Sequence, residues 1–262
     1  MYAFTFERPA TVADAVKLAA AGGKPLAGGQ TLLASMKLRL SAPDQLVDLA
    51  GIKELTGIKK DGNTLVIGAM SRHVDVATNA DVKAAFPALA WLAEHIGDRQ
   101  VRAMGTIGGS LANNDPAACY PSAVLGSGAT VVTSQREIAA DDFFQGLFAT
   151  ALKEDELITA VRFPVPKRAV YEKLRQKASH FPLVGVFLTQ SDSGAVRVAV
   201  TGAGNGVFRH KGLEDALTKS FTPESAASVK IDSGELNSDL HASAAYRANL
   251  ISVLTQRAVA KA

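Results

Sequence analysis

Two short segments of this chain place glycine pairs beside hydroxyl and amide side chains, with apolar residues on both flanks. Residues 27–33 read Ala-Gly-Gly-Gln-Thr-Leu-Leu, and residues 106–111 read Thr-Ile-Gly-Gly-Ser-Leu. Glycine allows positive φ and leaves no Cβ between the backbone and a ligand. Consecutive exposed N–H groups in such a turn form a concave anion site. An ordinary tight turn explains one glycine pair alone. A second pair, followed by Ala-Asn-Asn-Asp-Pro at 112–116, favours a nucleotide whose diphosphate is held from both sides.

The composition indicates a globular chain with room for two domains. It has 262 residues, 47% of them hydrophobic. No segment approaches the roughly 18 uninterrupted apolar residues of a membrane-spanning helix. The first residues lack the basic start and apolar core of a signal peptide. We therefore expect a cytoplasmic protein with no membrane span.

The single cysteine, Cys119, excludes an internal disulfide and limits metal chemistry. A [2Fe–2S] cluster normally needs four thiolates or a mixed set with histidines. One cysteine and five scattered histidines do not supply such a set. The net charge of +3, from 28 basic and 25 acidic residues, is too small to indicate a nucleic-acid partner. We expect no metal centre in this chain and no nucleic-acid binding.

The first 57 residues are typical of a βαβ unit that carries the first glycine segment. Thr11 is placed to cap a helix with apolar residues at helical spacing, which Gly22-Gly23 ends. A strand is predicted at 46–49. These features define a predicted N-terminal unit, residues 1–57.

A middle unit is predicted over residues 58–166. A hairpin turn at 61–63 precedes a buried strand at 65–69, and further strands are predicted at 129–133 and 157–163. A helix is predicted over 82–97, with Pro87 near its start or at a kink and Trp91 on its buried side. The sequence Pro-Val-Pro at 164–166 marks the boundary of the unit.

The C-terminal unit, residues 167–262, differs in its order of elements. Three strands are predicted at 170–174, 183–189 and 196–201, and three helices follow at 213–219, 223–229 and 241–260. Three antiparallel strands followed by helices predict an α+β domain. Glycines at 202, 204 and 206 follow a strand, but no acidic residue stands at the distance that a dinucleotide-binding unit requires, so we interpret them as a turn.

Three longer motifs resemble one family. The sequences LAGGQTLLASMKLRL, RQVRAMGTIGGSLANNDPAA and YEKLRQK are similar to those of the FAD-binding medium subunits of molybdenum hydroxylases, of the carbon monoxide dehydrogenase and xanthine dehydrogenase type. The resemblance extends from Phe4 to the final helix. It implies an α+β fold: a two-lobed FAD-binding domain of the p-cresol methylhydroxylase or vanillyl-alcohol oxidase type, followed by a three-stranded antiparallel sheet with helices.

The same resemblance implies an electron-transfer subunit that binds FAD. Electrons would come from a small partner subunit with [2Fe–2S] clusters and pass through FAD to an external acceptor. Substrate would be oxidised on a large molybdopterin subunit, and the assembly would be a dimer of heterotrimers. This chain would position and tune the flavin, so we name no catalytic residue on it.

The family's site residues transfer to matching positions here. Its two glycine segments hold the FAD diphosphate through backbone N–H groups and hydroxyls, which assigns cofactor binding to Ala27, Gly28, Gly29, Gln30, Thr31, Leu32, Thr106, Gly108, Gly109 and Ser110. For Leu32, packing behind the loop is an alternative.

Further cofactor contacts implied by the resemblance are Ile96, Asn113, Asp115, Lys173 and Phe181. Core packing is an alternative for Ile96, and a turn is an alternative for Asp115. Lys173, or Arg175 on the same strand face, is the candidate cation for a reduced flavin, and a solvated strand face is the alternative. Phe181 stands where carbon monoxide dehydrogenases carry a tyrosine over the flavin ring.

Cys119 departs from the aspartate that relatives usually carry, so a hydrogen bond to the cofactor is expected to be lost. The thiol is interpreted either as a small half-buried filler or as a reactive group.

Two other function classes remain open at this point. A free-standing flavin oxidase would need its own substrate pocket, and 262 residues leave little room for a cap domain. An assembly subunit that has lost FAD is the second alternative.

Overall fold

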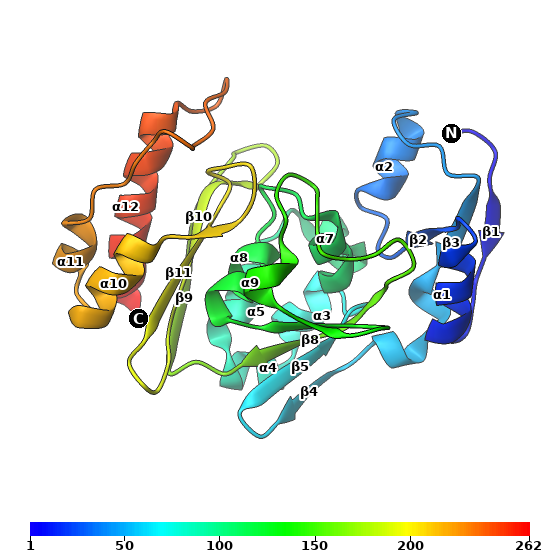
Figure 1. Cartoon of the computed structure of the whole chain (residues 1–262), viewed down its shortest axis with the longest axis horizontal. Coiled ribbons are helices and arrows are strands. Elements are labelled where there is room, and N and C mark those ends of the chain that lie inside the picture. The colour runs from blue at the N-terminus through cyan, green and yellow to red at the C-terminus, as the bar shows by residue number, and fades with distance from the viewer.

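The computed structural model describes all 262 residues and contains three sheets, one in each predicted unit (Figure 1). In the N-terminal unit, strands β1 (Thr5–Glu7) and β2 (Lys24–Leu26) each pair in parallel with the central β3 (Gln45–Asp48). Helix α1 (Val12–Ala20) begins as predicted, because Thr11 Oγ1 accepts a hydrogen bond of 3.1 Å from the Asp14 N–H. The unit is completed by α2 (Leu32–Lys37) and two short 3-10 turns, Leu49–Gly51 and Lys53–Leu55.

The middle unit is built on a five-stranded antiparallel sheet with the order β4-β5-β8-β6-β7. Its strands are β4 (Ile58–Asp61), β5 (Thr64–Gly68), β6 (Thr130–Thr133), β7 (Glu137–Ala139) and β8 (Ile158–Pro164). Its helices are α3 (His73–Thr78), α4 (Ala80–Ala85), α5 (Pro87–Glu94), α6 (Arg99–Met104), α7 (Ile107–Asn113), α8 (Tyr120–Ser127) and α9 (Ala140–Phe143). Side chains from both sheet and helices form the largest apolar core of the molecule.

The helix predicted over 82–97 is wrong in its length, because the segment forms two helices. Phe86 leaves the helical conformation, with φ −144° and ψ 64°, and Pro87 starts α5. Proline has no N–H to continue the preceding helix but suits the first position of a new one. Trp91 was also misassigned: it is 39% exposed, and its ring stacks on His95 with a centroid distance of 3.9 Å. The buried side of α5 is lined by smaller apolar side chains instead.

The C-terminal unit has a sheet of four antiparallel strands rather than the predicted three, in the order β12-β11-β10-β9. The predicted strands are β9 (Arg168–Arg175), β10 (Pro182–Gln190) and β11 (Val196–Thr201), and the additional β12 (Phe208–Arg209) has only two residues. Helices α10 (Lys211–Lys219), α11 (Pro223–Ala227) and α12 (Ala244–Lys261) follow. The last begins after the predicted His241, because Ser243 Oγ accepts from the Tyr246 N–H and caps it.

This C-terminal sheet is covered on both faces (Figure 1). Helix α12 packs on one face, and α8 of the middle unit packs on the other. Almost every residue of β10 is therefore buried, which explains its nearly continuous apolar sequence. Phe187 contributes to the core of the middle unit, whereas its neighbours Val186 and Leu188 pack under the C-terminal helices.

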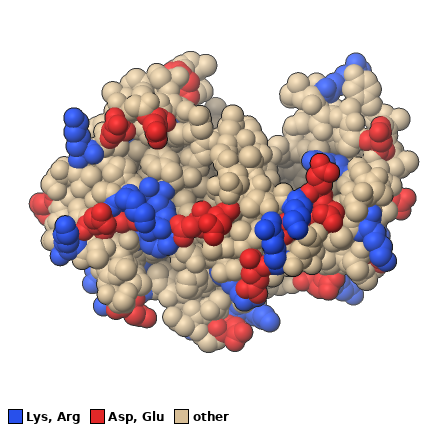
Figure 2. Space-filling model, in the orientation of Figure 1, with Lys and Arg blue, Asp and Glu red and all other residues tan.

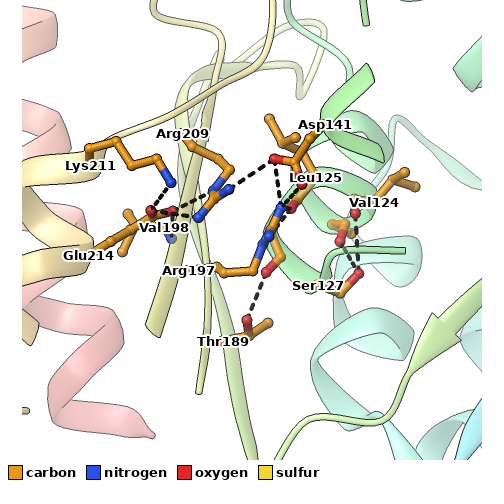
Figure 3. Close-up of polar contacts among 12 residues, drawn as sticks. Val124, Leu125, Ser127, Asp141, Thr189, Arg197, Val198, Arg209, Lys211 and Glu214 are labelled. Carbon is orange, nitrogen blue, oxygen red and sulfur yellow. Dashed lines mark hydrogen bonds and ion pairs between the residues drawn. The ribbon is translucent and has the colours of Figure 1, made fainter. Parts of the chain in front are cut away.

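A polar network also joins the C-terminal sheet to the middle unit (Figure 3). The Arg197 guanidinium on β11 donates to the Leu125 carbonyl at 2.8 Å and to both oxygens of Asp141 at 2.9 and 2.8 Å. The Arg209 guanidinium donates from Nη1 to Asp141 Oδ1 at 2.9 Å and from Nε to Oε1 of the buried Glu214 at 2.7 Å. Burial alone would raise the pKa of Glu214, but its hydrogen bonds, chiefly from Arg209, outweigh burial and lower the pKa. The network fixes the C-terminal sheet, and hence the 176–181 loop that follows β9, against the middle unit.

Candidate functional site

A cavity of about 700 Å³ lies where the three units meet. Figure 2 shows the surface hollowed between the N-terminal unit, on the right, and the middle of the molecule. The residues predicted for cofactor contact line it, with Lys173 as the exception: Ala27, Gly28, Gly29, Gln30, Thr31, Leu32, Ile96, Thr106, Gly108, Gly109, Ser110, Asn113, Asp115 and Phe181. Segments that are about 80 residues apart in the sequence thus face one space of the size that ligand sites usually have.

The first glycine segment presents free backbone donors to this cavity. The N–H groups of residues 27–31 donate to no acceptor within the protein. Gly29 has φ +69°, which turns the chain toward α2. Unpaired N–H groups are costly unless water or a ligand accepts from them. This run of N–H groups is therefore suited to bind an anion.

Gly28 brings the two segments into contact. A Cβ at this position would lie 2.0 Å from the Met104 carbonyl oxygen and 2.7 Å from Gly105 Cα. Only glycine allows the backbone of the first segment to approach the chain just before Thr106 this closely. The spacing of the two predicted segments in the cavity depends on this contact.

The second glycine segment differs from our prediction of a second backbone cradle. It is the first turn of α7, and its N–H groups are already used: Gly108 donates to the Ala69 carbonyl at 2.8 Å, and Gly109 donates to Thr106 Oγ1 at 3.1 Å. The Ser110 N–H donates to the Thr106 carbonyl at 3.0 Å. The expectation of twin amide cradles is therefore wrong for this half. Here the glycines allow close packing, since a Cβ on Gly108 would lie 2.6 Å from the Ala69 Cβ.

Hydroxyl groups supply the donors that the second segment's backbone lacks. Thr106 Oγ1 accepts from Gly109 but donates to no protein group, and Ser110 and Thr31 make no side-chain hydrogen bond. Each of the three lines the cavity. The cavity thus offers neutral donors on both sides, with five N–H groups and the Thr31 hydroxyl on the first segment and the Thr106 and Ser110 hydroxyls on the second. Such donors are suited to phosphate oxygens.

The remaining predicted residues occupy the cavity wall with mixed roles. Ile96 both lines the cavity and packs against the main core, so its two proposed roles coexist. Asp115 Oδ1 accepts from the Ala117 N–H at 2.8 Å, which is the turn interaction anticipated as its alternative, and the residue also lines the cavity. Asn113 lines the cavity and makes no side-chain hydrogen bond within the protein.

Lys173 lies behind the wall, and its predicted role needs correction. Its Nζ donates to the His95 carbonyl at 2.6 Å and to the His180 carbonyl at 2.8 Å, and lies 3.5 Å from Cys119 Sγ. Nor does Arg175 line the cavity. The ammonium group ties three separate segments of the cavity wall together, so it is a positioning residue rather than a direct contact.

Phe181, one of the predicted cofactor contacts, and Cys119 both lie in the cavity lining. The cysteine is 5% exposed, in agreement with a small filler, and Phe181 is 47% exposed at the rim. Positive φ at the preceding His180, 61°, helps to present the phenylalanine ring at the surface.

Three residues of the site escaped sequence analysis. Asn114 is fully buried and has φ 44°. Its Nδ2 donates to the Gly146 and Ala149 carbonyls at 2.8 and 2.7 Å. These bonds anchor the loop that places Phe148 in the cavity wall. Glu156 lines the cavity while bound to Arg136 at 3.0 Å. His73 packs closely against Gly105, since a Cβ on Gly105 would lie 2.5 Å from His73 Nε2. Burial, with a smaller effect of Arg102, lowers the pKa of His73 to about 4. Isolated polar residues carry no periodic signal that would have identified them.

Comparison with known proteins gives the family. The family described as the FAD binding domain in molybdopterin dehydrogenase matches residues 2–166. The chain belongs to this family. It is 35% identical to the carbon monoxide dehydrogenase medium chain of Hydrogenophaga pseudoflava, covering 98% of this chain and 96% of that one. It is 34% identical to the nicotine 6-hydroxylase medium subunit of Paenarthrobacter nicotinovorans, covering 99% and 97%.

A solved member has the same fold along its whole length. A chain of quinoline 2-oxidoreductase from Pseudomonas putida 86 superposes with a TM-score of 0.92 at 30% identity, covering 100% of this chain and 97% of that one. The family match confirms the resemblance seen in the motifs: this is a medium chain of the molybdenum hydroxylase type, related to subunits of oxidoreductases. No three His, Cys, Asp or Glu side chains gather as a metal site, and no helix is both long and apolar enough to cross a membrane.

Proposed function

We propose that this chain binds FAD in the cavity and passes electrons through it, from [2Fe–2S] clusters of a small partner subunit to an external acceptor. In this proposal substrate is oxidised on a large molybdopterin subunit. The observation that carries it is the run of unpaired N–H groups at residues 27–31, in a cavity of about 700 Å³. FAD supplies the capacity to exchange electrons singly or in pairs, and the protein supplies binding and orientation.

The residues of the cavity fit FAD in this assignment. The N–H groups of 27–31 and the hydroxyls of Thr31, Thr106 and Ser110 would donate to the diphosphate. Five neutral donors from one loop satisfy phosphate oxygens without basic side chains. Ile96 and Phe181 offer apolar surface for the rings. The relatives' designations as medium chains support a place between a larger and a smaller subunit.

We propose that the N-terminal and middle units form the two lobes of a vanillyl-alcohol oxidase-type FAD domain, with boundaries at 57 and 166. A dimer of heterotrimers and a cytoplasmic location are likewise predictions from the family.

Purification from the native host under gentle conditions, followed by analysis of flavin, iron and molybdenum, tests this function. We expect one FAD per chain and two co-purifying subunits that carry iron and molybdenum. A chain that purifies alone with a substrate-reducible flavin would be a free-standing oxidase. A colourless chain that does not take up added FAD would be an assembly subunit, and either result refutes the proposal.

A further inference from the structure

A second cavity, of about 340 Å³, adjoins the first. The two share the lining residues Asp115, Phe148, Ser179 and Phe181. We propose that the second cavity binds the oxidant of the reduced flavin, and that this oxidant is a neutral, planar quinone. This inference rests on the proposed function, because it assigns FAD to the first cavity. We call the second cavity the oxidant pocket.

Aromatic side chains at the shared wall are suited to a planar ligand. Phe148 is 56% exposed and Phe181 is 47% exposed, and Leu147, at 58%, extends the apolar surface of the oxidant pocket. Exposed apolar clusters of this kind commonly mark binding sites. Stacking and edge contacts with such rings favour flat, unsaturated ligands.

The backbone of both loops is strained where it presents these rings. Phe148 has φ 52°, and His180, next to Phe181, has φ 61°. A non-glycine residue in this region is strained and persists only when its surroundings enforce it. Here Asn114 anchors the first loop, and the Lys173 ammonium holds the His180 carbonyl at 2.8 Å. The two rings are thus held in place against a conformational cost, which is typical of functional sites.

Polar side chains in the oxidant pocket have hydrogen-bonding capacity to spare. The side chains of Asn237 and His241 make no hydrogen bond within the protein. Arg247 is 3% exposed, and its Nε has no partner. A quinone has two carbonyl oxygens that accept hydrogen bonds and no donor, so it complements a lining with unused donors.

The charge of the oxidant pocket disfavours a phosphorylated ligand such as a nicotinamide dinucleotide. Arg247 is the one arginine or lysine in its lining, and its guanidinium lies 2.7 Å from Asp239 Oδ2. Asp115 adds a second carboxylate. A diphosphate would therefore meet two carboxylates and no unpaired cation, whereas a neutral quinone meets no such repulsion.

The transfer of electrons and protons from reduced FAD to the quinone needs no further reactant. A quinone takes up two electrons and two protons and leaves as the hydroquinone, while FADH2 returns to FAD. The electrons come from the partner's clusters in the proposed function, and solvent replaces the protons.

Calorimetric titration of the FAD-loaded chain with 2-methyl-1,4-naphthoquinone tests the inference. Ala117 lines the oxidant pocket but not the FAD cavity, so Ala117→Phe fills only the former. We expect this variant to weaken quinone binding at least about 10-fold and Asn237→Ala to weaken it a few-fold, both at unchanged FAD content. Ala195→Phe, at an exposed position that lines neither cavity, is the matched control and should bind the quinone normally.

Failure of this inference and failure of the proposed function have different signatures. If the chain takes up no FAD, the proposed function is wrong, and the inference falls with it. If FAD binds stoichiometrically but Ala117→Phe and Asn237→Ala bind the quinone as the wild type does, only the oxidant pocket is wrong. Tight binding of NADH that Ala117→Phe abolishes would also overturn the choice of a neutral ligand. Asn237→Ala keeps the test valid should Ala117→Phe fail to fold.

Discussion

Replacing Gly28 with alanine should separate the two glycine segments and weaken FAD binding. The new Cβ would stand 2.0 Å from the Met104 carbonyl oxygen and 2.7 Å from Gly105 Cα. Real Cβ contacts are essentially never shorter than 3.0 Å, so the segments must move apart by about 1 Å. Every atom in the way belongs to the backbone, and therefore no side chain can rotate to relieve the contact.

The magnitude follows from the hydrogen bonds that such a shift breaks. A charge-assisted bond of about 2.8 Å that lengthens by about 1 Å is lost. One such bond contributes about 1.5–3 kcal/mol, which corresponds to a Kd raised about 10- to 150-fold. Overpacking should also lower the free energy of unfolding by about 1–3 kcal/mol.

Titration of the FAD-free chain, followed by quenching of flavin fluorescence, measures this effect. Riboflavin, which lacks the diphosphate, provides a matched ligand, and its affinity should change far less than that of FAD. Gly204→Ala provides a matched variant, because its Cβ would meet only ordinary contacts of 3.6 Å or more. It also probes the glycine-rich turn that we rejected as a dinucleotide site.

Two results would contradict this role of Gly28. Wild-type FAD affinity in Gly28→Ala would show that the close approach at Met104 does not set the geometry of the site. An equal loss for FAD and riboflavin would show that the diphosphate is not what the first segment binds.

Three further predictions concern the surroundings of the cavity. Because burial lowers the pKa of His73 to about 4, the unfolded chain binds a proton at this residue as the pH falls below 6.5, whereas the folded chain does not. The free energy of unfolding should therefore fall by roughly 3 kcal/mol between pH 6.5 and pH 4. Urea titrations across this range should show a weaker dependence of that free energy on pH in His73→Gln than in the wild type. Arg197→Ala should lower the midpoint of thermal unfolding, because it removes the guanidinium that donates to the Leu125 carbonyl and to both oxygens of Asp141, and leaves Arg209 as the only cation bound to Asp141; a midpoint within 1 °C of wild type would contradict this. Cys119 should react with N-ethylmaleimide several-fold more slowly when FAD fills the cavity, as mass spectrometry can follow; equal rates with and without FAD would place the thiol outside the site.

Local sequence patterns predicted the elements well where one signal dominated. The Thr11 cap, the hairpin before β5 and the three long strands of the C-terminal sheet follow from capping, turn chemistry and apolar runs. β12 escaped because two residues carry no periodicity. The long helix failed at Phe86, where proline at the next position stops one helix and starts another.

Tertiary contacts decided what the sequence could not. Nothing local indicates that the Gly108 N–H is taken by the Ala69 carbonyl, since that bond joins residues 39 positions apart. Alternation on β9 placed Lys173 on a strand face, but two distant carbonyls capture its ammonium. The glycine pairs could be found from residue type alone, whereas the donor status of their N–H groups depends on the assembled fold.

A crystal structure of the chain with FAD would show whether the N–H groups of residues 27–31 bind the diphosphate. We expect phosphate oxygens within about 3.2 Å of N–H groups from residues 27–31, with hydroxyls of Thr106 or Ser110 on the opposite side. A diphosphate bound elsewhere, or N–H groups of 27–31 that contact only water while FAD is present, would contradict it.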